Sequence, residues 1–79
     1  MSINHSTIYV SYRDGSKPNG KKVVMGFSGL TGGITNPAYT DRDGRAVVEH
    51  ASTVRATVYV DGRDYGSFNA PGTFSVILY

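Results

Sequence analysis

Three Asp-Gly pairs divide the chain, at residues 14–15, 43–44 and 61–62, and each borders a short run in which apolar and polar residues alternate. Asp tolerates the left-handed backbone region and hydrogen-bonds to nearby amides, while Gly adopts positive φ at no steric cost. An Asp-Gly pair between alternating runs is therefore among the strongest short-range indications of a β-hairpin. Three such pairs in 79 residues predict a small all-β domain built of antiparallel strands.

The alternation of apolar and polar residues predicts seven short strands. They cover residues 7–13, 21–27, 37–40, 45–50, 55–60, 63–68 and 73–79. The third is expected at a sheet edge, because Pro37 leads it and has no amide to donate. Seven strands at this spacing indicate a sandwich or a small barrel, and we expect a small antiparallel β-sandwich, Ig-like or transthyretin-like. The residues expected in its core are Ile8, Val10, Val23, Met25, Val48, Val58, Val60, Phe74, Val76 and Leu78.

The chain is long enough for one domain, which we place at residues 7–79 after a flexible leader at residues 1–6. Since there is no Cys, its core depends on aliphatic, aromatic and Met side chains alone. No stretch approaches the roughly 20 apolar residues of a membrane helix, and the leader lacks the basic and apolar regions of a secretory signal. The compartment stays open: the cytoplasm for a complete chain, the extracellular space for a domain of a larger secreted protein.

The formal net charge is weakly positive, at +2. Lys17, Lys21 and Lys22 gather around one turn, whereas charges of opposite sign alternate in residues 41–43 and 63–64. Nucleic-acid-binding domains usually carry a basic stripe interleaved with aromatic residues, so nucleic acid is not the expected partner. The alternative function is nevertheless a small basic β domain that binds single strands through these lysines and exposed tyrosines.

Side chains able to perform catalysis are few and scattered. Ser28, His50 and Asp41 could form a catalytic triad on paper, but the sequence around Ser28 fails the nucleophile-elbow pattern. The acidic residues fall in or beside predicted turns, except Glu49, which alternates outward. The two facing carboxylates of a glycosidase are therefore not expected either. The sequence predicts no catalytic site and no enzyme activity.

Two carboxylates at Asp41 and Asp43, followed by a Gly, resemble part of a calcium loop. On the EF-hand pattern the first ligand would then be Tyr39 and the twelfth His50, so two required carboxylates are missing. Two His and no Cys are too few for a structural zinc site. No metal ion or other cofactor is therefore expected.

The order of turns and strands carries a family resemblance. The first strand is followed by Asp14-Gly15, Pro18, Gly20 and Val23, then by Thr40-Asp41-Arg42-Asp43-Gly44 with residues 45–48, and by closing strands at 56–62 and 74–78. In this pattern the chain resembles the carboxypeptidase regulatory-like domains, which are similar in fold to transthyretin. The resemblance implies a non-catalytic accessory module without catalytic residues. From the turn itself we expect Asp41 to accept local amide hydrogen bonds and Gly44 to take positive φ.

Residues 28–36 form the longest break between predicted strands and contain three glycines. Binding residues fall disproportionately on loops of rigid scaffolds, so we expect a mobile binding loop here, with a protein or carbohydrate ligand. The partner would be another protein or the parent polypeptide, and the oligomeric state stays open. The rival interpretation is a crossover between the two sheets, which needs length for geometry alone. The expected binding residues are Ser28, Leu30, Thr31, Ile34, Asn36 and Tyr39, with Tyr12 nearby.

Overall fold

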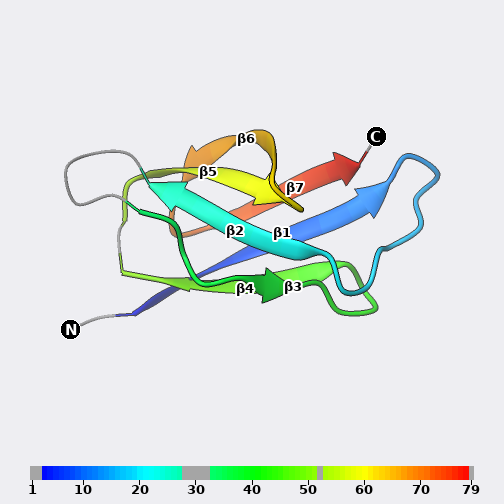
Figure 1. The fold of residues 1–79 in the computed structure, drawn as a ribbon, viewed down its shortest axis with the longest axis horizontal. Helices are drawn as coiled ribbons and strands as arrows, with labels where there is room; N and C mark the ends of the chain where they lie inside the picture. Colours follow the sequence, from blue (N-terminus) through cyan, green and yellow to red (C-terminus); the bar gives the residue numbers. More distant parts are fainter. Residues whose placement is uncertain (1–2, 28–32, 52, 79) are drawn as a thin grey trace.

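Seven strands in two facing sheets make up the computed structural model, which describes residues 3–27, 33–51 and 53–78 (Figure 1). None of these residues is helical, and no segment among them forms a helix able to span a membrane. The predicted all-β sandwich is confirmed. Its strands are β1 (Asn4–Tyr12), β2 (Lys22–Phe27), β3 (Ala38–Tyr39), β4 (Arg45–His50), β5 (Arg55–Val60), β6 (Arg63–Asn69) and β7 (Thr73–Leu78).

The strand order is β4-β1-β7 in one sheet and β3-β2-β5-β6 in the other. Every neighbouring pair is antiparallel except β1 and β7, which run parallel from Thr7 beside Thr73 to Tyr12 beside Leu78. The prediction of a purely antiparallel sandwich is therefore wrong for this pair. Parallel neighbours need a long connection between them, and here the whole chain from β2 to β6 provides it. Alternation along a strand carries no information on its direction.

One of the three Asp-Gly pairs forms a tight hairpin. Asp61 and Gly62 have φ values of 51° and 86° and join the neighbouring strands β5 and β6. Positive φ at both central residues is typical of the type I′ turn, whose twist matches that of antiparallel strands. The pairs at 14–15 and 43–44 instead lie on connections from one sheet to the other. The hairpin prediction is wrong for these two, because turn chemistry bends the chain but packing decides which sheet the next strand joins.

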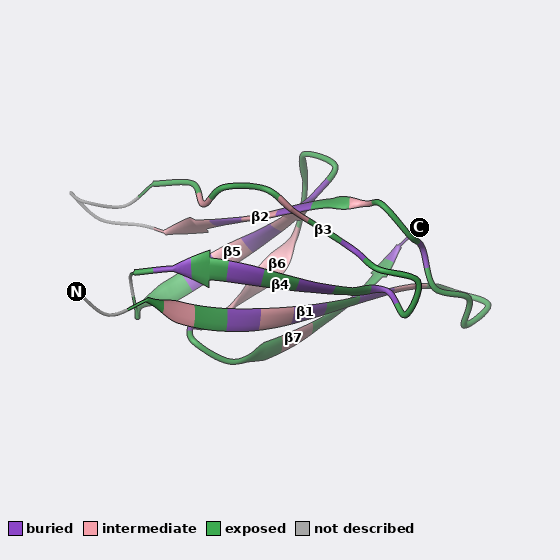
Figure 2. Cartoon of the chain, turned by 90° about the horizontal axis from the view of Figure 1, so that it is seen from below, coloured by how far each residue is buried: buried purple, intermediate pink, exposed green. Residues whose placement is uncertain are grey.

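The core lies between the sheets, where alternate residues of most strands are buried (Figure 2). Nine of the ten predicted core residues are buried, and the tenth, Phe74, is half-buried and stacks on Phe68 with ring centroids 5.4 Å apart. Burial of each large apolar side chain contributes about 1.5–3 kcal/mol. The buried apolar residues are Ile8, Val10, Val23, Met25, Ala46, Val48, Ala56, Val58, Val60, Ala70, Val76 and Leu78.

The first strand begins earlier than predicted. Asn4 pairs with His50 and Ser6 with Val48, so residues 4–6 belong to β1 and not to a flexible leader. Residues 4–6 are all polar, so no alternation of apolar and polar residues indicates a strand there. Ser6 nevertheless points to the same face of the strand as the buried Ile8. The third strand does lie at a sheet edge, as predicted, but has only two residues.

The turn before β4 is fixed by Asp41 and Gly44, as expected. The Asp41 carboxylate accepts hydrogen bonds from the amides of Asp43 at 2.9 Å and Arg45 at 3.0 Å. These bonds, that of Arg45 above all, lower the pKa of Asp41. Gly44 has φ 73°, and its carbonyl accepts a 2.7 Å hydrogen bond from the Val10 amide of β1. The turn is thereby attached directly to the central strand of the three-stranded sheet.

Candidate binding groove between β3 and β4

Residues 33–35 of the predicted binding loop are hydrogen-bonded to β2. The Phe27 amide donates to the Gly33 carbonyl at 2.8 Å and the Thr35 amide to the Met25 carbonyl at 2.9 Å. The Met25 amide also donates to Thr35 Oγ1 at 3.0 Å. Residues 33–35 therefore lie beside β2, where Ile34 forms an isolated antiparallel bridge with Gly26, and the predicted mobility of the loop stays a prediction. The rival crossover is wrong, because β2 and β3 are neighbours in one sheet.

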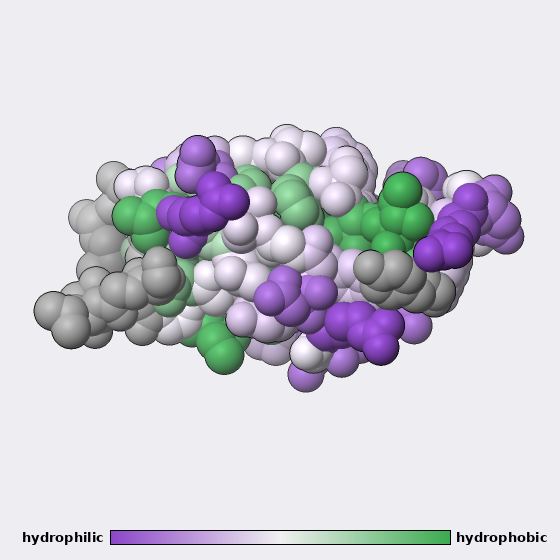
Figure 3. All heavy atoms as spheres, turned by 90° about the horizontal axis from the view of Figure 1, so that it is seen from above, coloured by the Kyte–Doolittle hydropathy of each residue, from purple (hydrophilic) through white to green (hydrophobic). Residues whose placement is uncertain are grey.

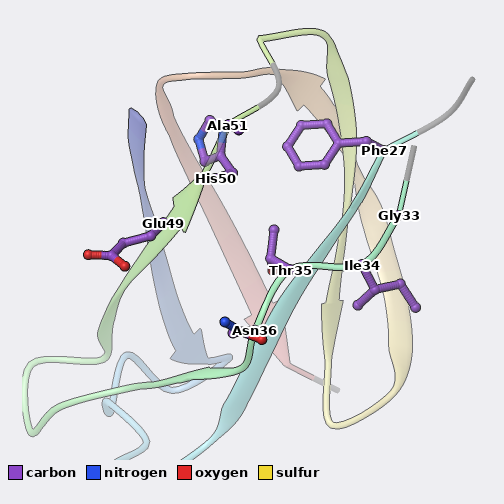
Figure 4. A pocket seen from close by; sticks show the side chains of 8 residues that line it. All are labelled: Phe27, Gly33, Ile34, Thr35, Asn36, Glu49, His50 and Ala51. Carbon is purple, nitrogen blue, oxygen red and sulfur yellow. The ribbon is translucent and has the colours of Figure 1, made fainter. Parts of the chain in front are cut away.

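A depression of about 320 Å³ opens between this segment and the end of β4 (Figure 4). The rings of Phe27 and His50 lie side by side at the end of the depression shown at the top of Figure 4, with centroids 5.4 Å apart and planes tilted by 41°. Thr35 and Asn36 lie on the opposite side, and the Glu49 carboxylate is directed away from the His50 ring. The lining residues are Phe27, Gly33, Ile34, Thr35, Asn36, Glu49, His50 and Ala51.

A second depression of about 500 Å³ adjoins the first, since Asn36 and Glu49 line both. Its other lining residues are His5, Pro37, Ala38, Tyr39 and Val47. The two together are here called the β3–β4 groove. Three large apolar side chains of the groove are exposed: Ile34 at 73%, Tyr39 at 60% and Val47 at 47%. Exposed apolar side chains gathered in neighbouring depressions are typical of a site that contacts another molecule.

Polar groups border the groove on the β4 side. His5 and Glu49 are opposite each other on β1 and β4, and His5 Nε2 lies 3.4 Å from Glu49 Oε1. Both side chains are more than half exposed, at 54% and 70%, so solvent screens their interaction. Together with the exposed Asn36 amide they provide donors and acceptors beside the apolar side chains.

A buried serine–histidine pair lies behind the groove. Ser6 Oγ and His50 Nε2 are 2.7 Å apart, and the Gly72 amide donates to the same Oγ at 3.2 Å. Ser6 has no exposed surface and His50 only 6%. A nucleophile must be reachable by its substrate, so this pair serves as a tie that joins β1, β4 and the segment before β7. Sequence reasoning missed it, although the phase of Ser6 with the core residues of β1 could have indicated it.

Half of the predicted binding residues can be placed. Ile34, Asn36 and Tyr39 line the groove, as described above. Ser28, Leu30 and Thr31 lie outside the described residues. Sequence reasoning missed the contribution of β4, namely Val47, Glu49 and His50, because nothing in the sequence shows that β4 faces β3 across the two sheets.

Tyr12 was predicted near this segment, but it is the last residue of β1, and that end of β1 lies away from the start of the β2–β3 connection (Figure 1). Tyr12 lines a separate depression of about 250 Å³ with Lys21 and Asp61. Lys21 Nζ is 3.4 Å from Asp61 Oδ2, and this contact raises the pKa of Lys21. One lysine of the predicted basic cluster is therefore neutralised by a carboxylate.

Among the residues that the structure describes, no three or more His, Asp or Glu side chains gather in a way that could hold a metal ion. No protein-family model matches the chain, and no curated protein matches its sequence.

Proposed function

We propose that this chain is a non-catalytic binding module that holds a segment of another protein in the β3–β4 groove. The observation that carries the proposal is the exposure of Ile34, Tyr39 and Val47 in two adjoining depressions. Apolar and aromatic side chains of this kind provide most of the energy at protein interfaces, and polar groups around them fix orientation. Asn36 and Glu49, which line both depressions, provide polar groups of this kind.

The length of the β2–β3 connection supports the same proposal. Neighbouring antiparallel strands are commonly joined by loops of two to five residues, whereas ten residues separate Phe27 from Ala38. Residues 33–35 of this connection are held against β2 and present Ile34 to solvent. A rigid arm costs less ordering entropy on binding than a free loop does.

An accessory module is also what the resemblance to carboxypeptidase regulatory-like domains implies, and membership of that family remains a prediction. A two-sheet sandwich is the architecture that the resemblance implies. The partner on this proposal is another protein or another part of the parent polypeptide.

The test uses a displayed library of random linear peptides, selected against the immobilised wild-type chain. Peptides that bind are then measured against Ile34→Ser and Tyr39→Ser by titration calorimetry. We expect each substitution to weaken binding at least about fivefold, since loss of a buried aromatic or aliphatic contact costs 1 kcal/mol or more.

The matched control is Ile77→Ser, because Ile77 is exposed to the same 60% as Tyr39 but lies on β7 at the far edge of its sheet. Binding should be unchanged in this variant. Selected peptides that bind both groove variants as tightly as the wild type would show that the groove is not the binding site.

A further inference from the structure

The two sheets end in four edge strands, and three of them carry features that block pairing with another strand. β3 has only two residues, β4 carries Arg45 and Glu49, and β6 carries Arg63 and Asp64. β6 is also interrupted by a bulge, where its register with β5 shifts near a residue of φ 121°, Gly66. Short length, charges and bulges are the means by which proteins prevent edge-to-edge association.

The fourth edge strand, β7, has none of these features. Its six residues, Thr-Phe-Ser-Val-Ile-Leu, include no charge and no proline. Its register with β1 is continuous from Thr73 to Leu78, so no bulge distorts this edge or prevents another strand from pairing with it. Figure 3 shows the molecule from the side on which β6 and the C-terminal end lie in Figure 1. Hydrophilic residues gather toward the two ends and one margin of this side, and a further hydrophilic group lies near its middle among weakly polar and apolar residues.

The free hydrogen-bonding groups of this edge can be assigned from the register. The Thr7 amide of β1 donates to the Gly72 carbonyl at 2.9 Å. Because successive residues of a strand direct their amide and carbonyl groups to opposite sides, those of Thr73, Ser75 and Ile77 point away from β1. The side chains of these three residues are exposed, and no strand in the described part of the chain lies along the side of β7 that faces away from β1.

We propose that β7 pairs antiparallel with β7 of a second copy of this chain. The pairing joins two three-stranded sheets into one continuous sheet of six strands. In the register centred on Ser75, that residue faces its own copy, and Thr73 faces Ile77 of the other copy on both sides. Each of these three pairs exchanges two backbone hydrogen bonds, so every free group of the edge is used.

A second copy fits this edge because the strand is complementary to itself. Thr73 and Ile77 are both β-branched, and such residues pair favourably across strands. The edge contains no charge that would repel its own copy or select a charged partner strand. The net charge of the chain is only +2, so repulsion between whole molecules is weak. The interface lies apart from the β3–β4 groove. The groove is lined by β4, which is the opposite edge of this sheet from β7.

The test is sedimentation equilibrium of the full chain from about 10 μM to 1 mM, a range that covers weak dimers. The wild type should pass from monomer to dimer as concentration rises. Ser75→Lys and Ser75→Glu each place like charges directly opposite across the interface and should weaken the dimer at least about tenfold. An equimolar mixture of the two variants should restore it, because Lys then faces Glu. The control Ile3→Lys, at an exposed site just before β1, should associate as the wild type does.

Hydrogen exchange of the wild type gives a second test, which does not depend on whether any substituted protein folds. The amides of Thr73, Ser75 and Ile77 should exchange quickly in dilute protein and slowly in concentrated protein, while those of Phe74 and Val76, bonded to β1, are protected in both. A wild type that stays monomeric throughout, a Ser75→Lys variant that dimerises undiminished, or a mixture that does not associate would overturn the proposal. A peptide strand that pairs with β7 of a monomeric wild type would show that another protein is the occupant instead.

Discussion

Gly44→Ala should destabilise the domain more than the same substitution at Gly15, Gly20 or Gly62. All four glycines have positive φ, but only at Gly44 would an added Cβ meet neighbouring atoms. At φ 73° a side chain costs about 1–2 kcal/mol, because its Cβ crowds the following carbonyl. At Gly44 the added Cβ would also overlap the backbone carbonyl oxygen of Val10. This oxygen belongs to the central strand β1 and cannot move aside as the end of a flexible side chain could.

The turn must therefore shift away from β1, which weakens the hydrogen bond from the Val10 amide to the Gly44 carbonyl. Loss of such a bond costs about 0.5–1.5 kcal/mol. The two effects sum to roughly 1.5–3.5 kcal/mol, and the midpoint of 2.5 kcal/mol corresponds to a fall in Tm of roughly 10–20 °C for a domain of this size. Thermal and urea unfolding followed by circular dichroism would measure it.

Gly62→Ala is the matched control. Gly62 has φ 86°, but a Cβ there would meet no atom within 4 Å. Only the backbone cost of about 1–2 kcal/mol then applies. Equal losses of stability in the two variants would refute the role assigned to the contact with Val10, and an unchanged Tm for Gly44→Ala would refute the turn itself.

Three further predictions concern the core, the buried polar tie and the acid limit. Met25→Ala, at a fully buried site, should lower the free energy of unfolding by about 2–5 kcal/mol in urea denaturation; a loss below 1 kcal/mol would contradict its place in the core. Ser6→Ala removes a partner from the Gly72 amide and the His50 ring and should cost about 1–3 kcal/mol, whereas a neutral result would mean that Ser6 ties nothing together. The lowered pKa of Asp41 means that its contribution is full above its unfolded pKa of about 3.8 and is lost as pH falls through the folded value. Wild-type stability should thus fall more steeply below pH 4 than that of Asp41→Asn, which keeps the acceptor oxygen; parallel pH curves would be inconsistent with this account.

The sequence predicted most of the strands because buried residues alternate with less buried ones along β1, β2, β4, β5 and the end of β7. Arg55–Val60 is the simplest example, since Ala56, Val58 and Val60 are buried and the residues between them are not. β1 was predicted to start late because its first residues are polar, although Ser6 is buried through hydrogen bonds to His50 and Gly72. A polar side chain that is buried because it is hydrogen-bonded has the same hydropathy as an exposed one, so the sequence pattern does not reveal its burial.

The candidate site was predictable only in part. Ile34, Asn36 and Tyr39 were found because they lie in or beside the longest break between predicted strands. The β4 half of the groove depends on how the two sheets face each other, and local patterns do not determine that. The parallel pairing of β7 with β1 is a long-range property of the same kind, and so is its free edge.

The central functional claim, that the β3–β4 groove is a binding surface, is tested most directly by NMR titration of the labelled chain with a peptide selected against it. The predicted result is that the largest amide shifts fall on Gly33–Tyr39 and on Val47–Ala51, which face each other across the groove. The amides of the hairpin at Asp61–Gly62, in the turn between β5 and β6, should not shift. Shifts concentrated on that hairpin or on β7, with the groove residues unchanged, would contradict the account.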